Sequence, residues 1–156
     1  MITLQFSSTF DWESRAIGFL TRSWASRVEV VFADACLIGS LPPRGVCLHS
    51  HPAGGYRRVE RYRVMVPAAP VYRFLRRQLG KPFDWGAVLG WPRRHWRAAG
   101  SWSGAELIAA AFEAAGTPLL RAPGRSRRRI TARDLLLSPR LRPFPQASLR
   151  PLASAA

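Results

Sequence analysis

The stretch Ser101–Gly116, SWSGAELIAAAFEAAG, constrains the fold of this chain more than any other segment. Its apolar residues recur every three or four positions, which places their side chains on one face of an α-helix. Alanine favours the helix throughout, Ser101 or Ser103 can cap its first turn, and Gly116 stands where a helix would end. We therefore predict one buried helix whose inward face is formed by Leu107, Ile108, Ala111, Phe112 and Ala115.

The first turn of this helix is a favourable place for a reactive group. It follows Trp102 and begins with small residues. Backbone N–H groups at a helix start lack partners inside the helix, and the helix dipole favours a negative thiolate or oxyanion there. Glu106 lies off the apolar stripe, and we interpret both it and Glu29 as ionised residues with a structural role.

Length and composition indicate one globular domain. The chain has 156 residues, of which 47% are apolar and 11% aromatic, so it can bury a sizeable core. No apolar run approaches the roughly 20 residues of a membrane span, so we predict no transmembrane segment. The start of the sequence lacks the basic and apolar regions of a signal peptide. We therefore expect a cytoplasmic protein, with export by another route or association with a virion left open.

The charge of the chain is strongly positive, at +15, and Lys81 is the only lysine. The arginines are scattered, and only Gly124–Arg129 forms a run. We interpret them mainly as solvated surface residues, with a polyanion-binding surface as the alternative. No nucleic-acid-binding motif accompanies them, so we do not expect specific nucleic-acid binding.

Two cysteines and a short histidine run are the candidate metal ligands. Cys36 and Cys47 are interpreted as free thiols. Cys47, His49 and His51 alternate, and on a strand they would share one face, which could suit a metal. No carboxylate near them completes an obvious zinc site. We therefore favour a surface or loop run and predict neither a metal nor a cofactor.

The order of the remaining elements predicts an α+β fold, because a cluster of antiparallel strands is followed mainly by helices. Residues 139–156 are rich in Pro and Arg, and we predict a loosely held tail after a domain of residues 1–138. In the helix expected at 12–21, the predicted inward side chains are Trp12, Ala16, Phe19 and Leu20. The other predicted strands are 2–6, 25–32, 36–39, 46–49 and 59–66, and the other predicted helices are 71–79, 83–90 and 132–137.

Two segments together carry a resemblance to a known family. The run from Trp102 to Leu107, WSGAEL, is similar to the aromatic–x–Cys–Ser–Glu–Leu motif of the permuted NlpC-type, papain-like cysteine hydrolases, the YiiX-like group. The run Gly80–Trp85, GKPFDW, resembles that family's Gly–Lys–Pro–Tyr–Asp–Trp signature, with Phe83 in place of the Tyr. Weaker matches lie at Gly45-Val46 and at Ile130–Leu135, and the similarity covers about residues 1–140. The resemblance implies a circularly permuted papain-like fold, with a small antiparallel sheet packed against helices.

The same resemblance assigns site positions, and two of them hold residues that cannot perform the chemistry. Gly104 stands at the nucleophile position and Arg27, at the start of the strand Ser26–Val31, stands at the base position. Ser40 is the nearest candidate for the third polar residue. A cysteine hydrolase needs a thiolate and an imidazole to take its proton. Glycine has no side chain, and an arginine is not deprotonated in proteins.

We therefore expect a catalytically degenerate member of this family. The resemblance implies a peptide, a peptidoglycan fragment or an acyl chain as ligand, or a structural role in a phage-like assembly, with five candidate binding residues: Trp102, Ser103, Phe83, Trp85 and Glu106. One alternative is an active hydrolase whose cysteine has been replaced by Gly104, which would leave Arg27 unexplained. The other alternative is the basic polyanion-binding module. Ser103 is one position away from the nucleophile position and would point elsewhere on the helix, so we interpret it as a cap.

Overall fold

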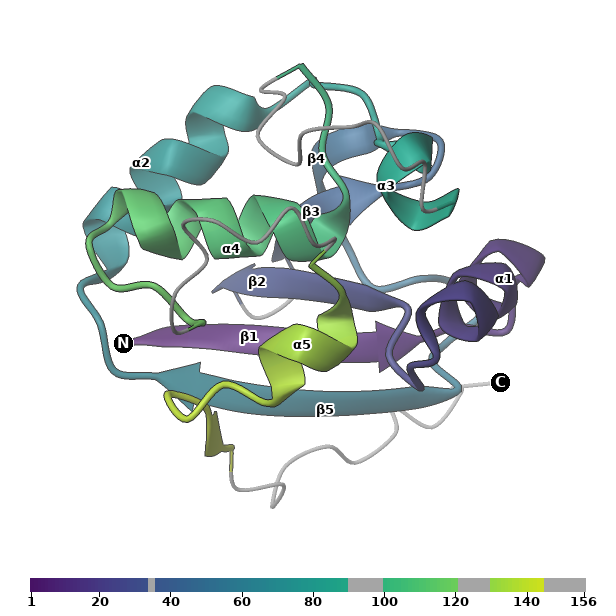
Figure 1. Ribbon diagram of the computed structural model, residues 1–156, viewed down its shortest axis with the longest axis horizontal. Helices are drawn as coiled ribbons and strands as arrows, with labels where there is room; N and C mark the ends of the chain where they lie inside the picture. The colour runs from purple at the N-terminus through teal and green to yellow at the C-terminus, as the bar shows by residue number, and fades with distance from the viewer. Residues whose placement is uncertain (34–35, 90–99, 121–129, 145–156) are drawn as a thin grey trace, which may run out of the picture.

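A single antiparallel sheet of six strands organises the molecule (Figure 1). The computed structural model describes residues 1–33, 36–89, 100–120 and 130–144. The strand order across the sheet is β4-β3-β2-β1-β5-β6. The strands are β1 (Ile2–Ser8), β2 (Arg27–Ala33), β3 (Cys36–Leu41), β4 (Gly45–His49), β5 (Arg58–Val64) and β6 (Arg142–Pro143). The helices are α1 (Trp12–Thr21), α2 (Ala68–Gln78), α3 (Trp85–Leu89), α4 (Gly104–Ala114) and α5 (Ala132–Leu136). This arrangement is the predicted α+β class.

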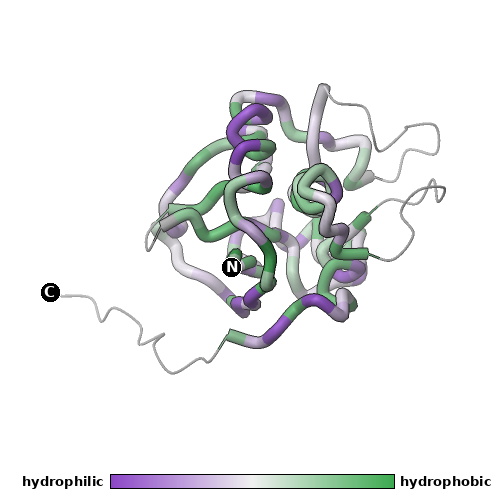
Figure 2. Tube along the Cα trace, turned by 90° about the vertical axis from the view of Figure 1, so that its left-hand side faces the viewer, coloured by the Kyte–Doolittle hydropathy of each residue, from purple (hydrophilic) through white to green (hydrophobic). Residues whose placement is uncertain are grey.

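The core lies between one face of the sheet and the helices α2 and α4. Alternate residues of the central strands point to this face, as Leu4 and Phe6 of β1 and Val28 and Val30 of β2 do, and all are buried. The period of two in their side-chain direction follows from the pleat of a strand. Figure 1 shows α4 and α5 in front of the sheet, and Figure 2 shows polar and apolar residues alternating along the trace. The apolar side chains of these elements gather in the core between the sheet and the helices.

Helix α4 matches the prediction from its spacing. Ser103 is the N-cap residue, since its hydroxyl accepts a hydrogen bond from the N–H of Glu106 at 3.4 Å. The helix ends at Ala114, two residues before Gly116. The φ of Gly116 is +71°, which is costly for any residue with a Cβ. The predicted inward residues Leu107, Ile108, Ala111 and Phe112 are all buried, and Ala115 packs against the same cluster.

Gly45 brings the β3–β4 hairpin into close contact with the segment after α2. The N–H of Val46 donates to the carbonyl of Lys81 at 2.8 Å, and the N–H of Gly80 donates to the carbonyl of Val46 at 2.9 Å. Gly45 has a φ of +73°, and a Cβ at this position would lie 2.1 Å from the Lys81 carbonyl oxygen. Two of the segments that carry the family resemblance are therefore in direct contact.

The predicted orientation of helix α1 is wrong. Trp12, Phe19 and Leu20 are exposed, and the buried residues of α1 are Ser14 and Ile17. Apolar spacing predicts that a face is apolar, but it does not decide whether that face packs on the sheet. Figure 1 shows α1 at one edge of the molecule, where Ile17 packs with Phe83 and Val88 in a small second cluster.

The second face of the sheet carries polar residues that are nonetheless buried. Gln5 at the centre of β1 donates a hydrogen bond to the hydroxyl of Tyr56 at 2.8 Å and accepts one from Nε of Arg61 at 2.9 Å. Beyond the predicted domain end at residue 138, the short strand β6 pairs with β5 at Tyr62 and Arg63. The rest of the predicted tail, residues 145–156, lies outside the described residues. No helix in the described part of the chain is long and apolar enough to cross a membrane.

Candidate functional site

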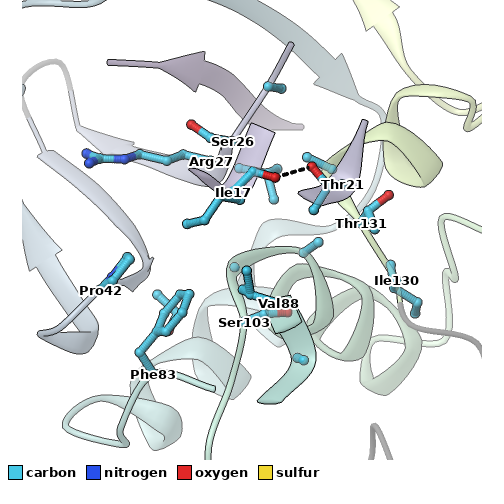
Figure 3. A pocket seen from close by; sticks show the side chains of 17 residues that line it. Ile17, Thr21, Ser26, Arg27, Pro42, Phe83, Val88, Ser103, Ile130 and Thr131 are labelled. Atoms are coloured by element: carbon cyan, nitrogen blue, oxygen red, sulfur yellow. Dashed lines mark hydrogen bonds between the residues drawn. The ribbon is translucent and has the colours of Figure 1, made fainter. Parts of the chain in front are cut away.

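Arg27, Ser40 and Gly104 line one cavity, which lies between the start of β2, the end of β3 and the first turn of α4 (Figure 3). Its volume is about 40 Å³. Helix α1 also contributes to the walls, through Ile17 and Thr21, as do residues 130–132 before and at the start of α5. Residues distant in the sequence therefore meet here, and the three positions that the family motifs single out are among them.

Gly104 is the first residue of α4, and its missing side chain faces the sheet. A Cβ built on it would lie 3.4 Å from the carbonyl oxygens of both Ser40 and Val28. This separation is at the lower limit of ordinary van der Waals contact, so a Cβ can be placed at Gly104. A residue here would stand at the N-terminus of an 11-residue helix, where the dipole stabilises negative charge.

Three segments meet at the backbone of Trp102, just before α4. The hydroxyl of Ser40 donates to the carbonyl of Trp102 at 2.6 Å, and the N–H of Asp84 donates to the same oxygen at 3.0 Å. The N–H of Trp102 donates to the carbonyl of Pro82 at 3.1 Å. The two motifs that carry the resemblance are therefore joined by backbone hydrogen bonds. The hydroxyl proton of Ser40 is therefore used in a structural hydrogen bond to the Trp102 carbonyl.

Arg27 forms an ion pair with Asp11 at the start of α1. The Nη2 atom of Arg27 lies 2.9 Å from Oδ2 of Asp11, and the Arg27 side chain is mostly buried. In Figure 3 the guanidinium points away from Ser103 and along the edge of the cavity. Partial burial alone would raise the pKa of Asp11, but hydrogen bonds from Thr9 and from the N–H of Ser14, together with the charge of Arg27, lower it below its ordinary value. Arg27 therefore links β2 to the cap of α1.

The Asp11–Arg27 pair predicts a dependence of stability on pH. Asn caps helices as well as Asp does, so Asp11→Asn keeps the bond from the Ser14 N–H and removes the charged oxygen that accepts from Thr9 and Arg27. We expect this variant to be less stable than the unmodified chain at neutral pH, by up to about 1 kcal/mol because the pair is partly solvated. The pKa of Asp11 is lowered on folding, so its contribution is present above the unfolded pKa of about 3.9 and is lost as the pH falls below that value. Urea unfolding of both proteins, from neutral to acid pH, measures the difference between their free energies of unfolding. An unchanged difference at acid pH would contradict the assignment.

Of the five predicted binding residues, two line the cavity and three lie outside its lining. Ser103 and Phe83 line the cavity. Trp102 is buried behind it, and its indole N–H donates to the Oε1 of Gln78 at 3.1 Å. Trp85 is partly exposed and packs edge-on against Phe83, and Glu106 is buried in α4 without lining the cavity. The contribution of α1 was missed, because the apolar pattern of that helix had no feature that connected it to the motifs.

The chemistry available in the cavity is limited to hydroxyl groups and one cation. Its described polar lining consists of Arg27 and the side chains of Thr21, Ser26, Ser40, Ser103 and Thr131. No thiol, imidazole or carboxylate lines it among the residues that the structure describes. At roughly 10–15 Å³ for each water, the cavity holds only a few non-hydrogen atoms. It can accept a small group, and none of the described side chains that line it is a general base.

The Cys47–His49–His51 run does not form a metal centre. The Nε2 atom of His49 lies 3.0 Å from Oε1 of the buried Glu29, a contact that becomes an ion pair when the imidazole is protonated. Burial opposes protonation of His49, but the adjacent Glu29 raises its pKa above the ordinary value. His51 instead contacts the hydroxyl of Tyr56 at 2.8 Å. Nowhere in the described ranges do three His, Cys, Asp or Glu side chains gather as metal ligands.

Comparison with known proteins relates this arrangement to a solved structure. No protein-family model matches this sequence, and no curated protein matches it. One similar structure is that of the metalloprotein YiiX from Escherichia coli O157:H7, with a TM-score of 0.68 and 16% sequence identity. The match covers 92% of this chain and 95% of that one. At this identity the likeness concerns the fold alone, and this chain therefore has a YiiX-like α+β fold.

Proposed function

We propose that this chain is a catalytically degenerate relative of the permuted NlpC-type cysteine hydrolases, which binds a small group of its ligand without cleaving it. The observation that supports this most is the position of Arg27, Ser40 and Gly104 around one cavity. A shared cavity is what the matches to the base, third polar and nucleophile positions require. The described lining contains neither a thiol nor an imidazole, so the two groups that cleavage needs are missing there.

The size and lining of the cavity restrict the kinds of ligand that it can accept. Pockets that enclose a drug-sized molecule measure roughly 300–1,000 Å³, and this cavity is about 40 Å³. A whole peptide or glycan would therefore lie across the surface and insert one small group. The apolar walls, which include Ile17, Val28 and Val88, favour an alkyl group such as an alanine methyl or the end of a short acyl chain.

A titration followed by NMR tests binding and cleavage in the same sample. The probes are tri-alanine, a muramyl dipeptide and hexanoyl-glycine. We expect at least one probe to shift the methyl signals of Ile17, Val28 and Val88, while its own signals persist without product. Ala87→Leu fills the cavity from α3 and should weaken this binding at least about tenfold. Ala114→Leu adds the same atoms at an exposed site on α4 and should leave it unchanged.

Two results would overturn the proposal. Product formation that survives Cys36→Ser with Cys47→Ser and disappears with Ser103→Ala would show an active hydrolase that uses Ser103. Absence of methyl shifts with all three probes would remove the binding role and leave only a structural one.

A further inference from the structure

Helix α1 presents an aromatic face to solvent. Trp12 is 71% exposed, Phe19 is 82% exposed, and Phe10, just before the helix, is 67% exposed. Trp12 and Phe19 are seven residues apart and therefore lie on the same side of the helix. Single exposed apolar residues are normal, but several large ones on one face usually mark an interaction surface. The opposite side of α1, with Ser14 and Ile17, is the one buried against the protein.

Positive charge flanks this aromatic face. Arg15 lies on one side of the Trp12–Phe19 line, at about 100° per residue around the helix, and Arg22 follows as the C-cap residue; both are exposed. The acidic residues of this region lie elsewhere. Asp11 is paired with Arg27, and Glu13 is on the other flank. An aromatic line with a basic border is the pattern of a helix that rests on an anionic bilayer.

A basic groove lies directly beside α1. It is lined by three arginines, Arg15, Arg57 and Arg58, and by hydroxyl-bearing residues that include Ser8 and Ser23, with a volume of about 630 Å³. No carboxylate lines it among the residues described. Phe19 belongs to the aromatic face and to this groove, so the two features are continuous.

The arginines of the groove differ in how far their charge is compensated. Arg58 forms an ion pair with Glu60 at 2.5 Å and its guanidinium lies 4.1 Å from the centre of the Trp24 ring. Arg15 and Arg57 form no ion pair within the part of the chain that the structure describes. The backbone of Arg57 is held by a hydrogen bond from its N–H to the carbonyl of Ser8 at 2.8 Å. Among the described residues, the groove therefore has two arginines without an ion pair, Arg15 and Arg57, and Phe19 lines it beside them.

We infer that α1 and this groove form a docking surface for an anionic phospholipid bilayer. Trp12 and Phe19 enter the boundary between headgroups and acyl chains, where aromatic side chains are favoured. Arg15 and Arg57 contact lipid phosphates, and the hydroxyl groups of the groove supply further hydrogen bonds to them. The net charge of +15 attracts the whole chain to such a surface. Nucleic acid is the less suitable partner, because Trp12 protrudes from a helix outside the groove and so offers no continuous stacking platform along it.

Vesicle flotation tests the inference with two paired variants. The unmodified chain is expected to bind vesicles of phosphatidylcholine with phosphatidylserine, to bind pure phosphatidylcholine weakly, and to release as salt rises. Arg15→Gln with Arg57→Gln should weaken binding roughly 25-fold, or about fivefold for each arginine. Trp12→Ser with Phe19→Ser should weaken it at least about tenfold. Brominated acyl chains should quench tryptophan fluorescence, and Trp12→Phe should reduce that quenching.

Matched controls separate this surface from general basicity. Arg133→Gln with Arg140→Gln removes the same charge from exposed positions outside the groove, and Met65→Ser with Leu137→Ser removes exposed apolar side chains outside α1. Both should stay within about twofold of the unmodified chain. All these side chains are exposed, so circular dichroism and thermal unfolding should show intact folding in each variant.

Three outcomes would overturn the inference. The first is the absence of binding to vesicles that contain phosphatidylserine. The second is an equal loss of binding in the control arginine pair, which would show diffuse electrostatic attraction without a site. The third is tighter binding to a single-stranded oligonucleotide, with the same dependence on Trp12, Phe19, Arg15 and Arg57, which would make the surface a nucleic-acid site.

Discussion

A chain that carries Gly104→Cys together with Arg27→His is expected to hydrolyse an activated ester faster than the chain with Gly104→Cys alone. The Cys places a thiol at the N-terminus of α4, and the imidazole supplies a base and proton donor, which the described lining of the cavity does not contain. General acid–base catalysis contributes about 10²–10⁴-fold in enzymes. We therefore expect a gain of roughly 10²-fold in single-turnover acylation, since the imidazole has not been positioned by selection.

The structure leaves room for the Cβ of the first substitution. A Cβ at Gly104 meets the carbonyl oxygens of Ser40 and Val28 at 3.4 Å, at the lower limit of ordinary van der Waals contact. The thiol of Gly104→Cys should titrate below the ordinary value of about 8.5, because the helix N-terminus favours the thiolate. Arg27 adds less to this shift than a free cation would, since Asp11 compensates its charge.

The background for these measurements is Cys36→Ser with Cys47→Ser, which removes the native thiols. Ala110→Cys in that background places a partly exposed thiol on the same helix but away from its first turn, and serves as the control for thiol reactivity. A thiol of ordinary pKa at residue 104, with the double variant reacting no faster than free cysteine, would contradict the view that Gly104 marks a degenerate nucleophile site.

Replacing Gly45 by alanine is expected to destabilise the protein by about 3–5 kcal/mol, among the largest effects of a one-atom change in side chain. Two costs combine at this position. The φ of +73° is strained for a residue with a Cβ, at about 1–2 kcal/mol. The added Cβ would also lie 2.1 Å from the carbonyl oxygen of Lys81, so the hairpin and the Gly80–Lys81 segment must separate and lose their hydrogen bonds.

Alanine substitutions at two other glycines, each measured by urea unfolding, separate the cost of backbone strain from the cost of the steric clash. Gly80 has a φ of +83° with open space around its missing Cβ, so Gly80→Ala should cost only the strain, about 1–2 kcal/mol. Gly54 has open space and no positive φ, so Gly54→Ala should be neutral or stabilising by up to about 1 kcal/mol. Equal effects at Gly45 and Gly80 would show that the close contact with Lys81 contributes nothing.

The local elements of this protein could be predicted because their signals lie within a few neighbouring residues. The three- and four-residue spacing of Leu107, Ile108 and Phe112 predicted the buried face of α4, and Ser103 was among its predicted caps. Alternation of apolar and polar residues predicted β1 and β5, and the density of β-branched residues predicted β2. These patterns arise within a single helix or strand, so they can be recognised in the order of neighbouring residues alone.

The family motifs selected positions that the fold then brought together. Arg27 and Gly104 were chosen from separate segments, and both line the cavity beside Ser40. The motifs did not indicate that Asp11 would pair with Arg27, or that α1 would form a wall. These contacts depend on how α1 docks, which no local pattern specifies.

What the sequence by itself determined is therefore the type and extent of the main elements, the α+β class, and the absence of a thiol and an imidazole from the matched positions. Only the tertiary structure decided which apolar faces are buried. Trp12 and Phe19 have the same helical spacing as a core face, yet they point to solvent because Ile17 and Ser14 face the protein instead. It also decided that Glu29 is buried against His49, where Gly39 leaves room for its side chain. Burial is set by the packing of elements that are distant in the chain, so it becomes defined only when the whole core has assembled.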